Sequence, residues 1–281
     1  MEYWSCVAAQ RAPQKMSNLP LYIYGLLCAA PDGLAQTLTE MKTPDGAGPA
    51  ELIEAGPFIA VASPHDGSEV LQRRRNMLAH TRLLEASMPY TTVLPMRFGI
   101  VADQVPMFAE MLSQKEAEIR SQFETLDGSV ELGLRIAWPR DAALSALAAS
   151  EPSLRERHIV LAARGPEAHY QRIEFGRKVA EALDSRRKTA ESALLEVLRP
   201  ISRSHILRAA EEDVEVLRAE FLVAADRQSE FIEVTEAAVE ACDFAAGAPA
   251  AVRCVGPAPA YNFVSLSLGS LQENDAPQKV A

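Results

Sequence analysis

The segment Thr91-Thr92-Val93-Leu94-Pro95-Met96-Arg97-Phe98-Gly99-Ile100-Val101 places one arginine inside an otherwise apolar run. An unpaired ion in a core is costly, so a buried-strand pattern usually excludes charge. Arg97 therefore either meets a specific partner group or lies where a strand opens onto a surface. The planar guanidinium suits bidentate pairing with a carboxylate. Two roles stay open for it: an anchor for a carboxylate of a partner, or one half of an internal ion pair.

The sequence on both sides of this segment predicts strands that alternate with helices. Aromatic and aliphatic runs bounded by Gly and Pro indicate strands, and apolar residues at the helical period indicate helices. We read residues 130–138 as a half-buried strand because apolar and polar residues alternate there. The predicted strands of the first half cover residues 21–28, 57–63 and the Arg97 segment, and its predicted helices cover 69–88 and 105–126.

The second half contains a strongly helical region, residues 141–210, followed by a strand, a helix and a final strand. Strand–helix–strand units on both sides of a helical middle predict an α+β protein. We expect two ferredoxin-like α/β sandwich domains, with a helical hairpin inserted between them or within the second. The expected organisation is a flexible leader at 1–19, domains at 20–127 and 128–265, and a disordered tail at 266–281.

Composition and charge narrow the class of protein. The 281 residues include 28 Lys and Arg against 38 Asp and Glu, a net charge of −10. Non-specific nucleic-acid binding needs a basic footprint, which this balance disfavours. Neither a signal peptide nor a membrane-spanning apolar run is recognisable. The charge balance and the lack of an apolar span lead us to expect no nucleic-acid and no membrane partner. The four cysteines form no CxxC pair, so we expect a reducing, cytoplasmic compartment.

The motif search finds no catalytic constellation. The sequence has no phosphate-binding GxxxxGK[ST] loop, no GxGxxG after the first strand and no GxSxG elbow. The five histidines lack HxxxH or HExxH spacing. We therefore expect no catalytic residue, no cofactor and no metal site.

Three other features have open interpretations. His80 lies on the flank of the predicted helix 69–88. It either makes a polar contact toward the Arg97 segment or a partner, or it is a half-buried histidine satisfied by a backbone group. Tyr22, Tyr24 and Phe58 are interpreted as core rather than as a ligand pocket. The rigid Gly256-Pro257-Ala258-Pro259 turn either presents Tyr261 and Phe263 to another surface or packs them back on the domain.

Several segments together resemble the gas vesicle protein F/L family over about residues 20–265. The resemblance rests on Leu94-Pro95-Met96-Arg97-Phe98-Gly99 and Gly256-Pro257-Ala258-Pro259-Ala260-Tyr261-Asn262-Phe263 in this order. Further support comes from Tyr22-Ile23-Tyr24-Gly25, His80 with Leu83-Leu84-Glu85, and Phe221-Leu222-Val223. Ala258 departs from the pattern, since the family often has tryptophan after Gly-Pro. The sequence does not separate the F branch from the L branch.

The resemblance implies a non-enzymatic accessory or minor structural protein of gas vesicle formation. Such a protein would bind the small hydrophobic shell protein and other gas vesicle accessory proteins, and so support nucleation or assembly of the cytoplasmic vesicle. The partner-binding residues would then include His80, Arg97, Phe98, Tyr261 and Phe263. The alternative is a small-molecule-binding or enzymatic ferredoxin-like protein with a pocket near Arg97 and His80.

Overall fold

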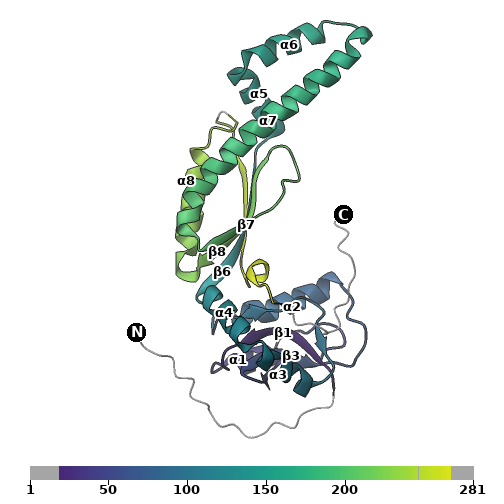
Figure 1. The fold of residues 1–281 in the computed structure, drawn as a ribbon, viewed down its shortest axis with the longest axis vertical. Helices are drawn as coiled ribbons and strands as arrows, with labels where there is room; N and C mark the ends of the chain where they lie inside the picture. Colours follow the sequence, from purple (N-terminus) through teal and green to yellow (C-terminus); the bar gives the residue numbers. More distant parts are fainter. Residues whose placement is uncertain (1–18, 246, 267–281) are drawn as a thin grey trace. The chain divides into compact units, whose positions relative to one another are not determined.

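The computed structural model describes residues 19–245 and 247–266, and the predicted leader up to residue 18 and tail from 267 lie outside this range. The described chain separates into two compact units (Figure 1). The first contains residues 19–86 and 96–119, and the second contains residues 87–95 and 120–266. We retain the predicted division between residues 127 and 128 as a proposal about which segments fold independently.

The first sheet is built around β1 (Leu21–Leu27), which is buried at all seven positions. Its strand order is β2-β3-β1-β4, and β5 also pairs with β1. Complete burial of β1 means that both of its faces are covered, which explains its continuous apolar sequence. The other elements of this sheet and of the chain that connects its strands are α1 (Leu34–Thr39), β2 (Glu51–Ala55), β3 (Phe58–Pro64), α2 (Arg74–Ser87), β4 (Leu94–Pro95), β5 (Val101–Ala102) and α3 (Val105–Gln114).

The second sheet is antiparallel, with the strand order β7-β8-β6-β9. Figure 1 shows α7 and α8 side by side on one face of it. The elements of this part are α4 (Glu116–Leu126), β6 (Ser129–Ala137), α5 (Arg140–Ser150), α6 (Pro152–Ala162), α7 (His169–Leu198), β7 (Ser204–Leu207), β8 (Glu215–Ala224), α8 (Gln228–Glu240) and β9 (Ala251–Ala258), with short 3-10 turns at 166–168, 199–201, 225–227 and 261–263.

The predicted α+β class is confirmed, and both sheets follow the element order of a ferredoxin-like unit, β-α-β-β-α-β. The two sheets also share one strand order, in which the first strand of each lies between the third and the fourth. The helical insertion lies within the second of them. It consists of α5, α6 and the first turns of α7, which extend the connection between β6 and β7.

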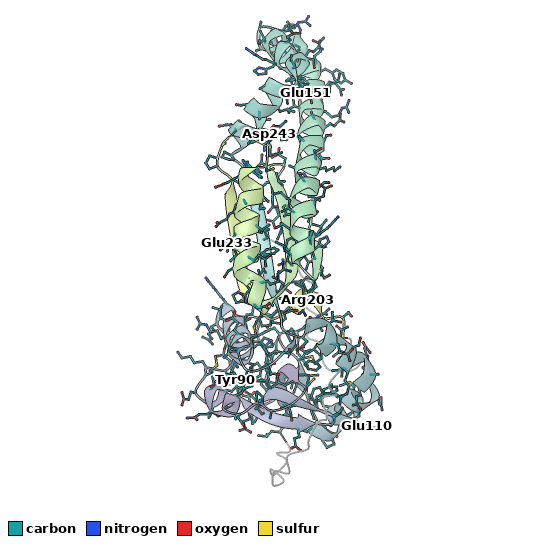
Figure 2. The ribbon with its side chains drawn as sticks, turned by 90° about the vertical axis from the view of Figure 1, so that its left-hand side faces the viewer. Tyr90, Glu110, Glu151, Arg203, Glu233 and Asp243 are labelled. Carbon is teal, nitrogen blue, oxygen red and sulfur yellow. The ribbon has the colours of Figure 1, made fainter. Side chains whose placement is uncertain are left out.

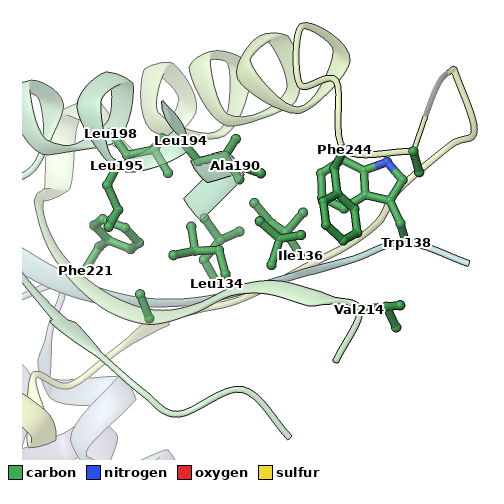
Figure 3. Close-up of a cluster of buried hydrophobic side chains, with 14 of the residues drawn as sticks. Leu134, Ile136, Trp138, Ala190, Leu194, Leu195, Leu198, Val214, Phe221 and Phe244 are labelled. Atoms are coloured by element: carbon green, nitrogen blue, oxygen red, sulfur yellow. The ribbon is translucent and has the colours of Figure 1, made fainter. Parts of the chain in front are cut away.

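The core of the second unit forms where α7 meets the sheet (Figure 3). Leu194, Leu195 and Leu198 of α7 lie over Leu134 and Ile136 of β6. Their spacing places the leucines on one helical face, and the alternation along β6 places its apolar residues on one sheet face. The helix and the sheet therefore bury matching apolar surfaces.

Three predicted elements are wrong in detail. The Arg97 segment is not one strand, because a turn at Phe98–Gly99 separates the two-residue strands β4 and β5. The helix predicted over 105–126 is interrupted at Lys115, whose φ of −107° and ψ of 16° are not helical. Residues 204–207, read as helical, form β7 because pairing with β8 overrides the weak local preference.

Candidate functional site

The Arg97 segment lies on a buried hydrogen-bond network in the first unit. The Tyr22 hydroxyl on β1 lies 2.9 Å from Nδ1 of His80 on α2. Nε2 of His80 lies 3.1 Å from the carbonyl oxygen of Met96. The backbone N–H of Gly99 donates to the Tyr22 hydroxyl oxygen over 3.1 Å. One tyrosine and one histidine thus hold the backbone on both sides of Arg97.

The geometry of this network shows which ring nitrogen of His80 carries a proton. A carbonyl oxygen only accepts, so Nε2 carries a proton and donates to Met96, and in the neutral ring Nδ1 then accepts from the Tyr22 hydroxyl. His80 is 2% exposed, and this burial lowers its pKa to about 4, against a smaller opposing effect of the Met96 hydrogen bond. The imidazole is therefore neutral at pH 7, which leaves Nδ1 free of a proton and able to accept.

The network presents an arginine and a phenylalanine at a turn. Arg97 is exposed and Phe98 is half-buried. The Phe98 ring lies edge-on to the rings of His80 and Tyr22, with centroid separations of 5.8 Å and 6.2 Å. The turn needs Gly99, whose φ is +91°, because residues with an L side chain are strained at positive φ. A charged side chain is thereby placed at the surface on a fixed backbone.

We expect Gly99→Ala to destabilise the protein by about 1–2 kcal/mol, because an L-residue is strained at this φ. Gly176→Ala is the matched control, since neither glycine has an atom within 4 Å of where a Cβ would lie. Gly176 lies inside α7, where alanine should stabilise by roughly 0.5–1 kcal/mol. Urea unfolding of both variants measures the contrast, and effects of the same sign would contradict this account of the turn.

In the second unit, the buried carboxylate of Glu131 holds the end of the segment 256–263. Glu131 on β6 is 6% exposed. It accepts from the backbone N–H of Asn262 over 2.9 Å and from its side-chain amide over 2.7 Å. Arg208 donates to the amide oxygen of Asn262. Burial raises the pKa of the Glu131 carboxyl, although the Asn262 hydrogen bonds oppose this. The 3-10 turn Tyr261–Phe263 is therefore fixed, and Tyr261 and Phe263 are both half-buried on it.

An open sheet edge lies directly before this turn. Among the described residues β9 pairs only with β6, and positions 251–257 are all exposed. Val252 is 40% exposed and Val255 is 54% exposed. An edge strand leaves a row of backbone donors and acceptors available for another strand. In contrast, the opposite edge strand, β7, has only four residues.

The described residues show little that resembles a reaction centre. In ranges 19–245 and 247–266, no group of three His, Cys, Asp or Glu side chains is placed to hold a metal ion. A small cavity of about 60 Å³ is lined by residues 101–104, Met107, Phe108 and Met111, and neither His80 nor Arg97 lines it. A wider one of about 470 Å³ lies between α5, α7 and the chain after α8. Within the described chain, no helix combines the length and apolar character of a membrane span.

The structure brings some of the predicted site residues together. Phe98 packs on His80, and Arg97 precedes it in the turn, whereas Tyr261 and Phe263 belong to the second unit. Tyr22, Tyr24 and Phe58 are core residues, as predicted.

Three features of the structure are not evident from the sequence. Tyr22 was assigned to the core without its hydrogen bond to His80. Glu131 was missed although the alternation of its strand marks it as a polar-face residue. Its partner Asn262 lies 131 residues away, which no local pattern reveals. The final strand was predicted only to residue 255, and its complete exposure was not foreseen.

Comparisons with known proteins all lead to one family. The chain matches the family model described as "Gas vesicle synthesis protein GvpL/GvpF" over residues 20–265. A protein named "Gas vesicle protein F" from Streptomyces sp. is 25% identical over 244 residues, which are 86% of this chain and 98% of that protein. A protein of the same name from Nostoc sp. is 24% identical over 219 residues, covering 77% of this chain and 87% of that protein.

Two solved structures share the fold. The crystal structure of the gas vesicle protein GvpF from Anabaena sp. superimposes with a TM-score of 0.74 at 24% identity, covering 89% of this chain and 99% of that one. The GvpF structure from Microcystis aeruginosa gives a TM-score of 0.69 at 22% identity, covering 88% of this chain and all of the other.

Proposed function

The chain belongs to the GvpL/GvpF family of gas vesicle synthesis proteins, and on this premise we propose that it is a cytoplasmic accessory protein that binds the hydrophobic shell protein during vesicle formation. Membership supports a part in gas vesicle formation. Binding of the shell protein, and of other accessory proteins, is our proposal. No catalytic role is included in it.

The observation that carries the proposal is the open edge of β9. Apart from Pro257, which has no N–H, the eight-residue edge offers main-chain hydrogen bonds to an added strand, and side-chain contacts then supply selectivity. On β9, Val252 and Val255 add exposed apolar surface, and Arg253 is the only charged residue. Such an edge suits a partner that is itself largely apolar. An edge of this kind would also promote aggregation if it stayed uncovered.

The Arg97 turn is proposed as a second contact. Arg97 is exposed, and the buried hydrogen bonds of Tyr22 and His80 fix the backbone on either side of it. A fixed backbone leaves only the side chain of Arg97 to be ordered when its planar guanidinium pairs with a carboxylate. Within the predicted set, Arg97 and Phe98 would touch the partner and His80 would position them. Tyr261 and Phe263 would contribute from the turn that follows β9.

We expect Val255→Lys to weaken capture of the shell protein at least about tenfold, because a lysine on an edge strand opposes addition of another strand. The experiment co-expresses the tagged full chain with the shell protein and quantifies the shell protein retained. Met107→Lys is the matched control, since Met107 is 58% exposed and Val255 is 54% exposed. Met107 lies on α3, in the other unit.

The outcomes separate the two parts of the proposal. No capture by the folded wild-type chain would refute shell-protein binding itself. Normal capture that Val255→Lys leaves unchanged would refute the β9 edge as the site. Arg97→Ala tests the second contact: weaker capture with an unchanged melting temperature supports an anchor, whereas a lowered melting temperature with unchanged capture supports an internal role.

The alternative of a small-molecule pocket near Arg97 and His80 gains no support from the geometry. Both ring nitrogens of His80 are hydrogen-bonded within the protein. The rings of Tyr22, Tyr24 and Phe98 lie against the imidazole, with centroid distances of 5.4 to 5.8 Å. A ligand at His80 would have to displace packed aromatic side chains.

A further inference from the structure

The helical insertion of the second unit ends in an apolar and basic tip. We define the tip as α6 and the first turns of α7, residues 152–180. It carries four large apolar side chains that are 49–72% exposed, namely Ile159, Val160, Tyr170 and Ile173. Exposed apolar groups clustered on a projecting element mark an interaction surface.

The charge of the tip is opposite to that of the chain. Residues 152–180 contain six Arg and Lys against three Glu, whereas the whole chain carries a net charge of −10. Arg155 lies one helical turn before Ile159, and Arg157 one turn before Val160. Neither arginine forms an ion pair with another described residue, and both are exposed. The apolar pair on α6 is thus flanked by two available cations.

The outer face of α8 has the complementary character. This helix contains four glutamates and no Lys or Arg. Glu233, Glu236 and Glu240 are exposed and make no ion pair within the described chain, whereas Glu230 pairs with Arg227. Ile232, which is 41% exposed, lies among them. Figure 2 labels Glu233 on this helix.

We propose that two copies of this chain associate by packing the tip of each against α8 of the other. The matched features are an isoleucine–valine pair flanked by arginines and an isoleucine flanked by glutamates. This inference concerns the second unit alone and does not depend on binding of the shell protein.

The fold allows both contacts to form in one symmetric pair. The tip includes the beginning of α7, while α8 packs beside the second half of α7. The middle of α7 marks the boundary, because Arg186 there donates to the carbonyl oxygens of Phe244 and Asp243, just after α8. A helix of 30 residues is about 45 Å long. Two such helices in antiparallel arrangement bring each tip to the α8 of the partner, and a two-fold pair closes without further growth.

The test measures the mass of the full chain by light scattering and sedimentation over a range of concentrations, at about 50 mM and about 500 mM salt. We expect a concentration-dependent rise toward twice the 30.6 kDa of one chain, weaker in high salt. The tip variant Arg155→Glu with Arg157→Glu, and the α8 variant Glu233→Arg with Glu236→Arg, should each weaken association at least about tenfold, because like charges would then face each other.

A mixture of the tip variant and the α8 variant tests directly whether the tip of one copy meets α8 of the other. In each variant the substituted positions carry charge of the same sign as the unchanged surface that they would face, whereas the substituted tip positions of one variant and the substituted α8 positions of the other are opposite in sign. Association should therefore return in the equimolar mixture. Lys42→Glu with Arg74→Glu is the control for the tip variant, since it makes the same change in net charge at exposed positions of the first unit and should leave association intact.

A wild-type chain that stays monomeric at low salt and about millimolar concentration would overturn the proposal. So would variants that associate normally, a mixture that stays monomeric, or a mass that grows beyond the dimer. Circular dichroism of each variant confirms that loss of association is not loss of folding.

Discussion

Replacing Phe231 with alanine is expected to lower the free energy of unfolding by about 3–5 kcal/mol, the range found for a fully buried phenylalanine. Phe231 on α8 is 0% exposed and packs on Phe221 of β8, with ring centroids 5.0 Å apart. Its removal deletes the large buried apolar side chain with which α8 packs on the sheet and leaves a cavity in the core. Urea unfolding followed by circular dichroism measures the change.

The control for this substitution is the next residue. Ile232 is 41% exposed on the same helix, so Ile232→Ala should change stability by no more than about 0.5 kcal/mol. Both measurements are made at low protein concentration, so that self-association does not contribute. Equal losses for the two variants would mean that α8 does not pack as described.

Acidification is expected to remove roughly 2–3 kcal/mol of stability through His80. Burial lowers its pKa to about 4, whereas an unfolded histidine has a pKa of about 6.5. As the pH falls through this window, the unfolded chain takes up a proton that the folded chain refuses. The stability due to neutral His80 is therefore complete above pH 6.5 and is lost progressively toward pH 4. Protonation of Nδ1 would also break its hydrogen bond from the Tyr22 hydroxyl.

His80→Gln isolates this effect from the carboxylates that titrate over the same range. A glutamine amide can still donate to the Met96 carbonyl but does not titrate. The variant should be less stable than the wild type at neutral pH, because it loses the ring contacts with Tyr24 and Phe98. The difference should shrink as the pH is lowered to about 4, since only the wild type pays for protonation. A difference that stays constant with pH would show that His80 is not a buried neutral group.

Much of the fold could be predicted from local patterns. The alternation over residues 130–138 identifies β6, and the apolar period of residues 166–198 identifies α7, because each element buries one face. The Arg97 segment shows where this reasoning ends. Its apolar run resembles a buried strand, yet Gly99 turns the backbone and divides it into β4 and β5. A glycine within a strand pattern is a weak signal of such a turn.

The candidate site was only partly predictable. Arg97 and His80 stand out in the sequence as a charge in an apolar run and a histidine on a helix flank, and the family resemblance adds Phe98, but neither signal says what each side chain does. The structure shows that His80 is buried and hydrogen-bonds to the Met96 carbonyl next to Arg97, which is the basis of our proposal that it positions the turn. Glu131 and Asn262 show the same limit, because their bonds join residues far apart in sequence.

The sequence by itself determined most of the elements and the family: the spacing of apolar residues indicates a helix or a strand, and the motifs at residues 94–99 and 256–263 together indicate the gas vesicle family. Only the tertiary structure decided how the elements pair and what they leave exposed. Pairing over long sequence separations places β6 between β8 and β9, leaves β9 as the open edge and projects the α6–α7 tip. The physical reason is that periodicity reports which face of an element is apolar, whereas burial depends on which other elements cover that face.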